Sequence, residues 1–170
     1  NGYGGYSLYD FRSTGGLRAY KVSFDRPSAE LEEYSNLLRY EYNMIRWLES
    51  QGYDVSYVTN LDVHTNPSRL SQHKVLLDAG HNEYWSLEMR NAVENARNAG
   101  MHLAFFSSNT AYWRVRFEPS TSGVANRVMV CYKSATPGDP VAPTYRFRDA
   151  PNNRPENALM GVMYIGDHGA

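Results

Sequence analysis

The sequence has little cysteine and no excess of charge of one sign. Cys131 is the only cysteine in 170 residues, so no disulfide forms within the chain and no CxxC pair serves zinc or redox chemistry. The 17 Lys and Arg balance 18 Asp and Glu, and the net charge of -1 gives no polybasic surface for nucleic acid or an anionic membrane. No apolar run approaches the roughly 18 residues of a membrane span. We therefore expect neither a nucleic-acid nor a membrane partner, and nothing demands an oxidising compartment, so a cytoplasmic location is the expectation.

Length and hydrophobic content are sufficient for one domain. With 170 residues, 42% of them hydrophobic, the chain is long enough for a core and too short for two large domains. We expect a single α/β domain over residues 1–170. The chain opens on NGYGGYS and closes on IGDHGA, both loop-like, which indicates a segment of a longer protein.

Tyrosine is abundant. The chain has 14 tyrosines, and aromatic residues make up 14% of it. A tyrosine ring is amphipathic, and its hydroxyl needs a partner when it is buried, which favours pocket walls and interfaces. A half-buried sheet surface explains the same composition, and both interpretations stay open.

Strands and helices are predicted to alternate through the first two thirds of the chain. Apolar spacing predicts a helix over Glu30–Ser50 with Tyr42 on its inner face, and Ser86 is placed to cap another helix that ends near Gly100. Asn66 and Pro67 predict the start of a short helix. This alternation is typical of an α/β fold with a doubly wound, mostly parallel sheet flanked by helices. The strands that we expect are Leu17–Phe24, Tyr53–Val58, Lys74–Ala79 and Met101–Phe106.

The rhythm changes after Asn109. YWRVRF (112–117) and RVMVCYK (127–133) read as two further strands without a helix between them. They predict a C-terminal antiparallel extension of the same domain, with Cys131 as a small core residue.

Polar residues follow several of the predicted strands. In open α/β sheets the ligand crevice lies at the carboxyl ends of the strands, where the loops meet. We therefore expect one rim to gather these residues, and we take Asp25, Arg26 and Asn109 as candidate substrate-binding residues. The residues in question are Asp25, Arg26, Asp62, His81, Glu83 and Asn109.

The motif GHNEYWS, residues 80–86, is the strongest candidate for a site. His81 and Glu83 are two positions apart in an extended turn, so both side chains can face one cavity or one metal ion. A structural histidine, and a glutamate that pairs with Arg114 or Arg116, are the alternatives. No serine or cysteine stands at the tip of the turn, and the chain has no GxGxxG or GxxxxGKS sequence, so neither acyl-enzyme chemistry nor nucleotide binding is favoured. Tyr84 and Trp85 fit core or pocket-wall positions.

Five motifs together resemble the large (β) subunit of N,N-dimethylformamidase and its relatives. The resemblance covers nearly the whole chain in the same order and implies a fold similar to class I glutamine amidotransferases. It also implies hydrolysis of an amide C–N bond and a small partner subunit, with a homo-oligomer as another possible assembly. The motifs are YGGYSLYDF (3–11), KVSFDRP (21–27), EYNMIRWLESQGYDVSYVT (41–59), GHNEYWS (80–86) and RPENALMG (154–161).

The resemblance also implies a mononuclear ferric iron with two tyrosine ligands and one glutamate ligand. By motif, Glu83 is the glutamate ligand, and Tyr42 and Tyr3 are the candidate tyrosines; the family loop usually has a further tyrosine just before the position of Asn1. His81 and Glu156 then correspond to the catalytic histidine and the second glutamate. Phenolate and carboxylate oxygens suit a ferric ion, which polarises an amide carbonyl and acidifies a bound water.

Two other functions remain open from the sequence. A non-catalytic α/β domain that binds a carbohydrate or another small ligand would use the many tyrosine and tryptophan rings as a stacking surface. An interaction module of a larger assembly is the third reading. The first hypothesis requires Glu83 and tyrosine oxygens close to one ion, and the others do not.

Overall fold

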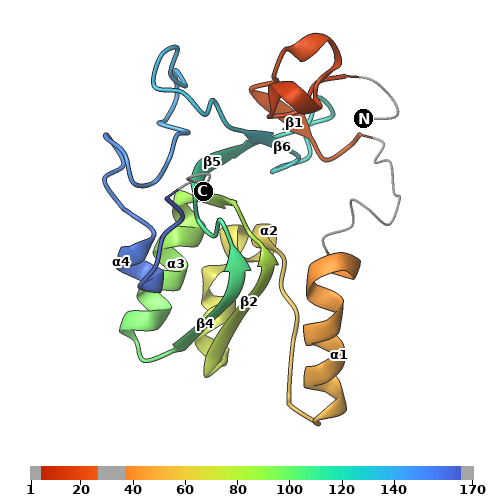
Figure 1. The fold of residues 1–170 in the computed structure, drawn as a ribbon, viewed down its shortest axis with the longest axis vertical. Helices are drawn as coiled ribbons and strands as arrows, with labels where there is room; N and C mark the ends of the chain where they lie inside the picture. Colours follow the sequence, from red (N-terminus) through yellow and green to blue (C-terminus); the bar gives the residue numbers. More distant parts are fainter. Residues whose placement is uncertain (1–4, 27–36, 166–170) are drawn as a thin grey trace, which may run out of the picture.

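The computed structural model describes residues 5–26 and 37–165 and has an α/β architecture with mixed sheets (Figure 1). Tyr3 lies outside the described residues, as does the first part of the helix predicted over Glu30–Ser50. The described helices are α1 (Tyr42–Ser50), α2 (Asn60–Thr65), α3 (Leu87–Asn98) and α4 (Asn157–Met160). The described strands are β1 (Lys21–Ser23), β2 (Val75–His81), β3 (Tyr84–Ser86), β4 (His102–Ser108), β5 (Trp113–Glu118) and β6 (Val128–Val130).

A parallel pair of strands forms the first sheet. Strands β2 and β4 run from the pair Val75–His102 to the pair His81–Ser108. The predicted strands at Lys74–Ala79 and Met101–Phe106 are confirmed, and β2 continues through His81. Figure 1 shows α1 on one side of this sheet and α3 on the other. Leu76, Leu103 and Phe105 pack against a core that includes Trp85 of β3 and Met89 and Val93 of α3.

Helix α3 begins where the sequence predicts. The Ser86 hydroxyl accepts a hydrogen bond from the Met89 backbone nitrogen at 3.1 Å, which satisfies one of the free N–H groups of the first turn. Glu88 lies in the same turn, where its negative charge is favourable against the helix dipole. Met89 and Val93 are then one turn apart and both face the core.

The second sheet is mixed, with the strand order β1-β6-β5-β3. Strand β5 pairs with β6 antiparallel and with β3 parallel, which confirms the predicted antiparallel extension. A separate small core lies against this sheet and contains Leu8, Val22, Val115 and the buried Cys131. Cys131 is thus a core residue, as expected.

Several expectations about the strands were wrong. Strand β1 is shorter than Leu17–Phe24 and pairs antiparallel with β6, so it does not extend the parallel sheet. Residues 53–58 form no strand. The doubly wound sheet is therefore not confirmed in the described part of the chain. A strand forms only where a neighbouring strand accepts and donates its backbone hydrogen bonds. The composition of a segment therefore does not decide whether it forms a strand or which sheet that strand joins.

Helix α1 differs from the expectation in its burial. None of its residues is buried, and Tyr42 at its start is 46% exposed, so the inner position predicted for Tyr42 was wrong. The turn before it does approach the sheet. Gly80 adopts φ +91°, and a Cβ on it would lie 3.0 Å from Glu41 Cγ and 3.1 Å from Tyr40 Cβ. Glycine is the residue that allows both this conformation and this approach.

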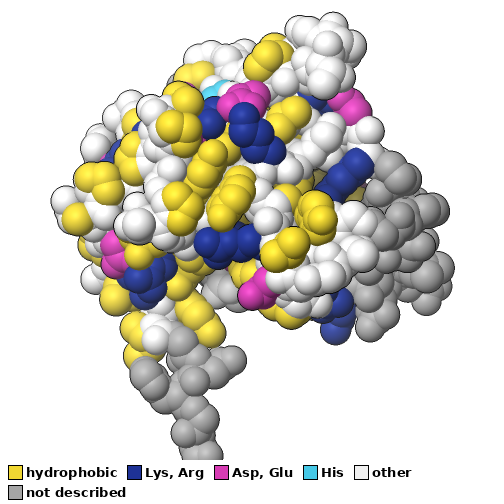
Figure 2. All heavy atoms as spheres, turned by 90° about the horizontal axis from the view of Figure 1, so that it is seen from above, with side chains coloured by type: hydrophobic (Ala, Val, Ile, Leu, Met, Phe, Trp, Pro, Cys, Tyr) yellow, Lys and Arg dark blue, Asp and Glu magenta, His cyan; other side chains and the backbone are white. Residues whose placement is uncertain are grey.

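The surface carries charge of both signs. On the face shown in Figure 2, hydrophobic side chains are interspersed with Lys and Arg and with fewer Asp and Glu. Among residues 5–26 and 37–165, no helix is both long enough and apolar enough to cross a membrane.

Candidate functional site

Glu83 lies where the two sheets meet. Only Asn82 and Glu83 separate the end of β2 from the start of β3, which belongs to the other sheet. The Asn82 carbonyl accepts a hydrogen bond from the Ala111 nitrogen at 3.0 Å, and the Glu83 carbonyl accepts one from the Trp113 nitrogen at 2.9 Å. The backbone on both sides of the carboxylate is therefore fixed. The Glu83 residue is 7% exposed.

The sequence correctly places His81 beside Glu83. A hydrogen bond of 3.2 Å joins His81 Nε2 to Glu83 Oε2, and a second of 2.8 Å joins His81 Nδ1 to the hydroxyl of Ser108. Ser108 is the register partner of His81 across the parallel pair. One ring nitrogen is thus oriented by the sheet while the other faces the carboxylate, an arrangement that fixes the orientation of the imidazole.

Tyr9 is a member of this cluster that the sequence did not identify. Its hydroxyl donates a hydrogen bond to Glu83 Oε1, the carboxylate oxygen that His81 does not contact. Leu8, buried in the small core, and the hydrogen bonds of Ser13 to the loop backbone fix the position of Tyr9. Burial, followed by the hydrogen bond and the charge of Glu83, raises the pKa of Tyr9 to about 12.

Lys133 is the second residue that the sequence did not identify. Its ammonium nitrogen lies 3.9 Å from Glu83 Oε1 and donates a hydrogen bond of 2.6 Å to the Tyr84 hydroxyl. The same nitrogen lies 3.0 Å from the centre of the Tyr9 ring and 5.1 Å from that of Trp113. Burial lowers the pKa of Lys133 to about 8, and the charge of Glu83 opposes part of that change. Burial also raises the pKa of Tyr84.

The motifs give weak signals for both residues. Tyr9 belongs to the loop YGGYSLYDF, which contains three tyrosines, and nothing local distinguishes the one that meets Glu83. Lys133 follows the apolar run VMVCY, where a lysine is unusual because burying its charge is costly. That one signal could have identified it.

The structure does not bring the remaining candidates to Glu83. Glu156 is 1% exposed and forms a two-pronged ion pair with Arg148, with hydrogen bonds of 2.7 and 3.0 Å. No hydrogen bond joins Tyr42 to Glu83 or His81 among the residues described. Tyr3 lies outside them. The alternative partners of Glu83 also bind elsewhere, because Arg114 donates to Asn152 and Arg116 to Asp139.

The predicted rim is present only in part. Asn109 follows β4 directly after Ser108, so it lies beside the His81 end of the parallel pair, with φ +52°. Asp25 instead forms an ion pair with Arg127, with a hydrogen bond of 2.9 Å, near the mixed sheet, and Arg26 is exposed. Asp62 lies in α2, where it completes a capping box with Thr59. The rim failed at Asp25 because β1 runs in the other sheet.

The chemical types of the donor atoms in the cluster, which are phenol and carboxylate oxygens and an imidazole nitrogen, are compatible with a hard metal ion. Among the described residues, no group of three or more His, Cys, Asp and Glu is arranged to bind a metal. Tyrosine, however, is outside that set of residue types, and the Tyr9 phenol, the Glu83 carboxylate and the His81 imidazole converge here. Oxygen donors of this kind suit a ferric ion.

Comparison with known families decides the assignment. The profile of the family described as "N,N-dimethylformamidase beta subunit-like, C-terminal" matches residues 1–170. The chain belongs to this family. The match covers the glycine and tyrosine loop as well as GHNEYWS, so both halves of the cluster lie inside the N,N-dimethylformamidase beta subunit-like region. No curated protein matches the chain.

Proposed function

We propose that the chain forms the active site of a metal-dependent hydrolase that cleaves the C–N bond of an amide. One observation carries the proposal. Tyr9 and His81, from two separate parts of the chain, both form hydrogen bonds with the carboxylate of Glu83. Membership of the N,N-dimethylformamidase beta subunit-like family is consistent with a hydrolase. Iron is the proposed metal, held by Glu83 and Tyr9, with Tyr42 and Tyr3 as the further candidate ligands.

A bound ferric ion would supply a Lewis acid for the amide carbonyl and would lower the pKa of water. With Glu83 engaged by a metal, His81 Nε2 would be free of its hydrogen bond to the carboxylate and would be the group that accepts a proton from water and delivers one to the leaving amine. The hydrogen bond to Ser108 keeps the ring aligned during both transfers. Lys133, whose pKa is about 8, brings a positive charge close to Glu83 and stabilises negative charge there.

Two broader features belong to the same proposal. The parallel pair β2–β4 with α1 and α3 on opposite sides supports a glutamine amidotransferase-like fold for the domain. The words "beta subunit-like" in the family description support a partner subunit. We also propose that Asn109, beside His81, contributes to substrate binding, as Asp25 and Arg26 would if the assembly brought them to the site.

The test is metal analysis and an optical spectrum of the purified protein. Wild type should bind stoichiometric iron and show a visible tyrosinate-to-iron absorption. Tyr9→Phe should lose most of that absorption, and Glu83→Gln should lose the iron. Tyr6→Phe is the matched control, because Tyr6 lies in the same loop and is 53% exposed.

Tyr42→Phe, measured in parallel, shows whether Tyr42 adds a second ligand. A folded protein that binds no iron after reconstitution would refute the metal site. That result would favour the carbohydrate or small-ligand domain instead.

A further inference from the structure

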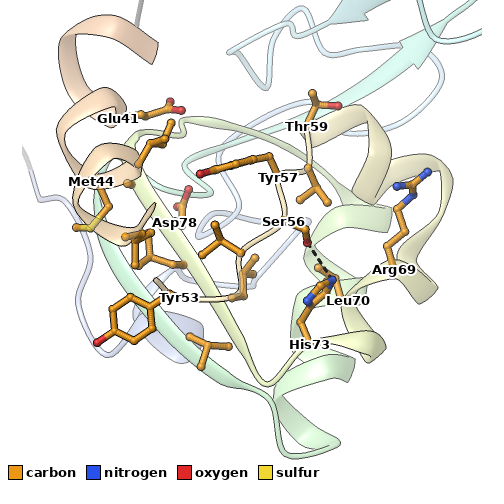
Figure 3. A pocket seen from close by; sticks show the side chains of 18 of the residues that line it. Glu41, Met44, Tyr53, Ser56, Tyr57, Thr59, Arg69, Leu70, His73 and Asp78 are labelled. Carbon is orange, nitrogen blue, oxygen red and sulfur yellow. Dashed lines mark hydrogen bonds between the residues drawn. The ribbon is translucent and has the colours of Figure 1, made fainter. Parts of the chain in front are cut away.

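A long cavity lies beside the candidate site. It has a volume of about 940 Å³ and lies between α1, the extended segment 53–59 and β2 (Figure 3). Its lining follows β2 from Lys74 to Asn82, and it includes His81. A strand rises about 3.3 Å per residue, so the cavity extends for roughly 20 Å along β2. His81 and Asn82 lie at one end of this length.

The cavity communicates with the cluster through one side chain. His81 lines the cavity and at the same time forms the hydrogen bond of 3.2 Å with Glu83. The polar side chains nearest to it already bind one another. Asn60 donates to Asn82 at 2.8 Å, and Asn82 donates to Asp78 at 2.8 Å. A ligand that enters here meets His81 as the polar group next to Glu83.

The middle of this length carries apolar side chains on both sides, whereas the end away from His81 is polar, with Arg69, Gln72, His73 and Lys74. Ile45 and Leu48 of α1 face the cavity on one side, and Val55, Val75 and Leu77 line it on the other. Met44, Ile45 and Leu48 of α1 are only partly buried, so part of their apolar surface faces the cavity. Such a surface gains free energy when an apolar group covers it.

The size of the cavity exceeds what a small amide needs. Cavities of about 300 to 1,000 Å³ enclose drug-sized ligands, and this one is near the upper limit. N,N-dimethylformamide has five heavy atoms and would contact only the His81 end. Covering the apolar middle of the cavity needs a substituent of several carbons.

We propose that this groove binds the apolar substituent of an amide whose C–N bond lies at His81, so that the preferred substrates are amides with an aryl or alkyl group of about six or more carbons. The inference rests on the proposed hydrolase function, from which it takes the amide as the substrate class. Recognition of the apolar group depends on the groove alone. It is therefore measured by binding, separately from turnover.

The experiment compares N-benzylformamide with N,N-dimethylformamide by calorimetric titration of the full-length protein. We expect N-benzylformamide to bind wild type at least tenfold more tightly. Leu48→Trp and Ile45→Trp fill the groove from α1 and should each remove that preference. Arg46→Trp places the same side chain on the exposed side of α1 and should retain it.

Equal affinity of wild type for the two amides would overturn the inference. So would a preference that survives in both groove variants. Hydrolysis by the iron-loaded wild type is followed in parallel. If neither amide is cleaved, the hydrolase proposal fails, whereas the binding data still decide whether the groove recognises the apolar group.

Discussion

Glu156→Gln should destabilise the protein rather than disable its chemistry. Glu156 is buried, and its carboxylate accepts hydrogen bonds from Arg148 at 2.7 Å from Nη2 and 3.0 Å from Nε. Removing one partner of a buried ion pair costs about 3 to 5 kcal/mol, because the other charge is left unpaired. The Arg148 side chain is 15% exposed, so water screens part of that charge and the lower value of about 3 kcal/mol applies. For a chain of this length this lowers Tm by roughly 6 to 12 °C.

The assay is urea and thermal unfolding of wild type, Glu156→Gln and a matched control. Glu118→Gln makes the same chemical change at a carboxylate that is 27% exposed and pairs with Lys21, which is 50% exposed, and with Arg116. Because Arg116 keeps its ion pair with Asp139, this change should cost less than about 1 kcal/mol. The double variant Glu156→Gln with Arg148→Met should recover much of the lost stability, since no unpaired charge remains. A Glu156→Gln variant as stable as wild type but without amide hydrolysis would refute this reasoning and restore the catalytic role that the family resemblance implies.

Two further predictions concern β2. Burial raises the pKa of Asp78 from 3.8 to about 6, so between these values the folded chain holds more protons than the unfolded chain and stability falls as pH rises. Asp78→Asn should therefore gain about 3 kcal/mol relative to wild type between pH 4 and pH 7 in chemical unfolding, and a pH-independent difference would contradict this. Gly80→Ala should destabilise by about 1 to 3 kcal/mol more than Gly123→Ala, because a Cβ on Gly80 would press on Glu41 and Tyr40, while a Cβ on Gly123, at φ +83°, meets nothing within 4 Å. Equal losses in thermal unfolding would show that only backbone strain matters.

Local signals predicted the elements whose causes are local. The Ser86 cap, the apolar stretch of β2 and that of β4 depend on residues within a few positions of each other, and all three predictions are confirmed. Residues 53–58 have a strand-like composition but form no strand. Strand formation also needs a hydrogen-bonding neighbour, which no local pattern supplies.

The candidate site was predictable on one side only. His81 and Glu83 are two positions apart and follow an apolar run, so their proximity could be inferred from the sequence. Tyr9 meets Glu83 across 74 positions, and Lys133 lies 49 positions from its hydrogen-bond partner Tyr84. Such contacts depend on how β3, β5 and β6 assemble into one sheet, which depends on packing rather than on spacing. The ion pair of Glu156 with Arg148 spans only eight positions, but the residues between them form irregular turns whose path no periodic pattern predicts.

The site lies at the junction between the two sheets, so its geometry depends on how the sheets are placed relative to each other. The connections 82–83 and 109–112 both lead from the parallel pair to the mixed sheet; the first contains Glu83, and the second is hydrogen-bonded to it through Ala111 and Asn82. Any rotation of one sheet against the other would therefore change the distance between the His81 imidazole and the Glu83 carboxylate.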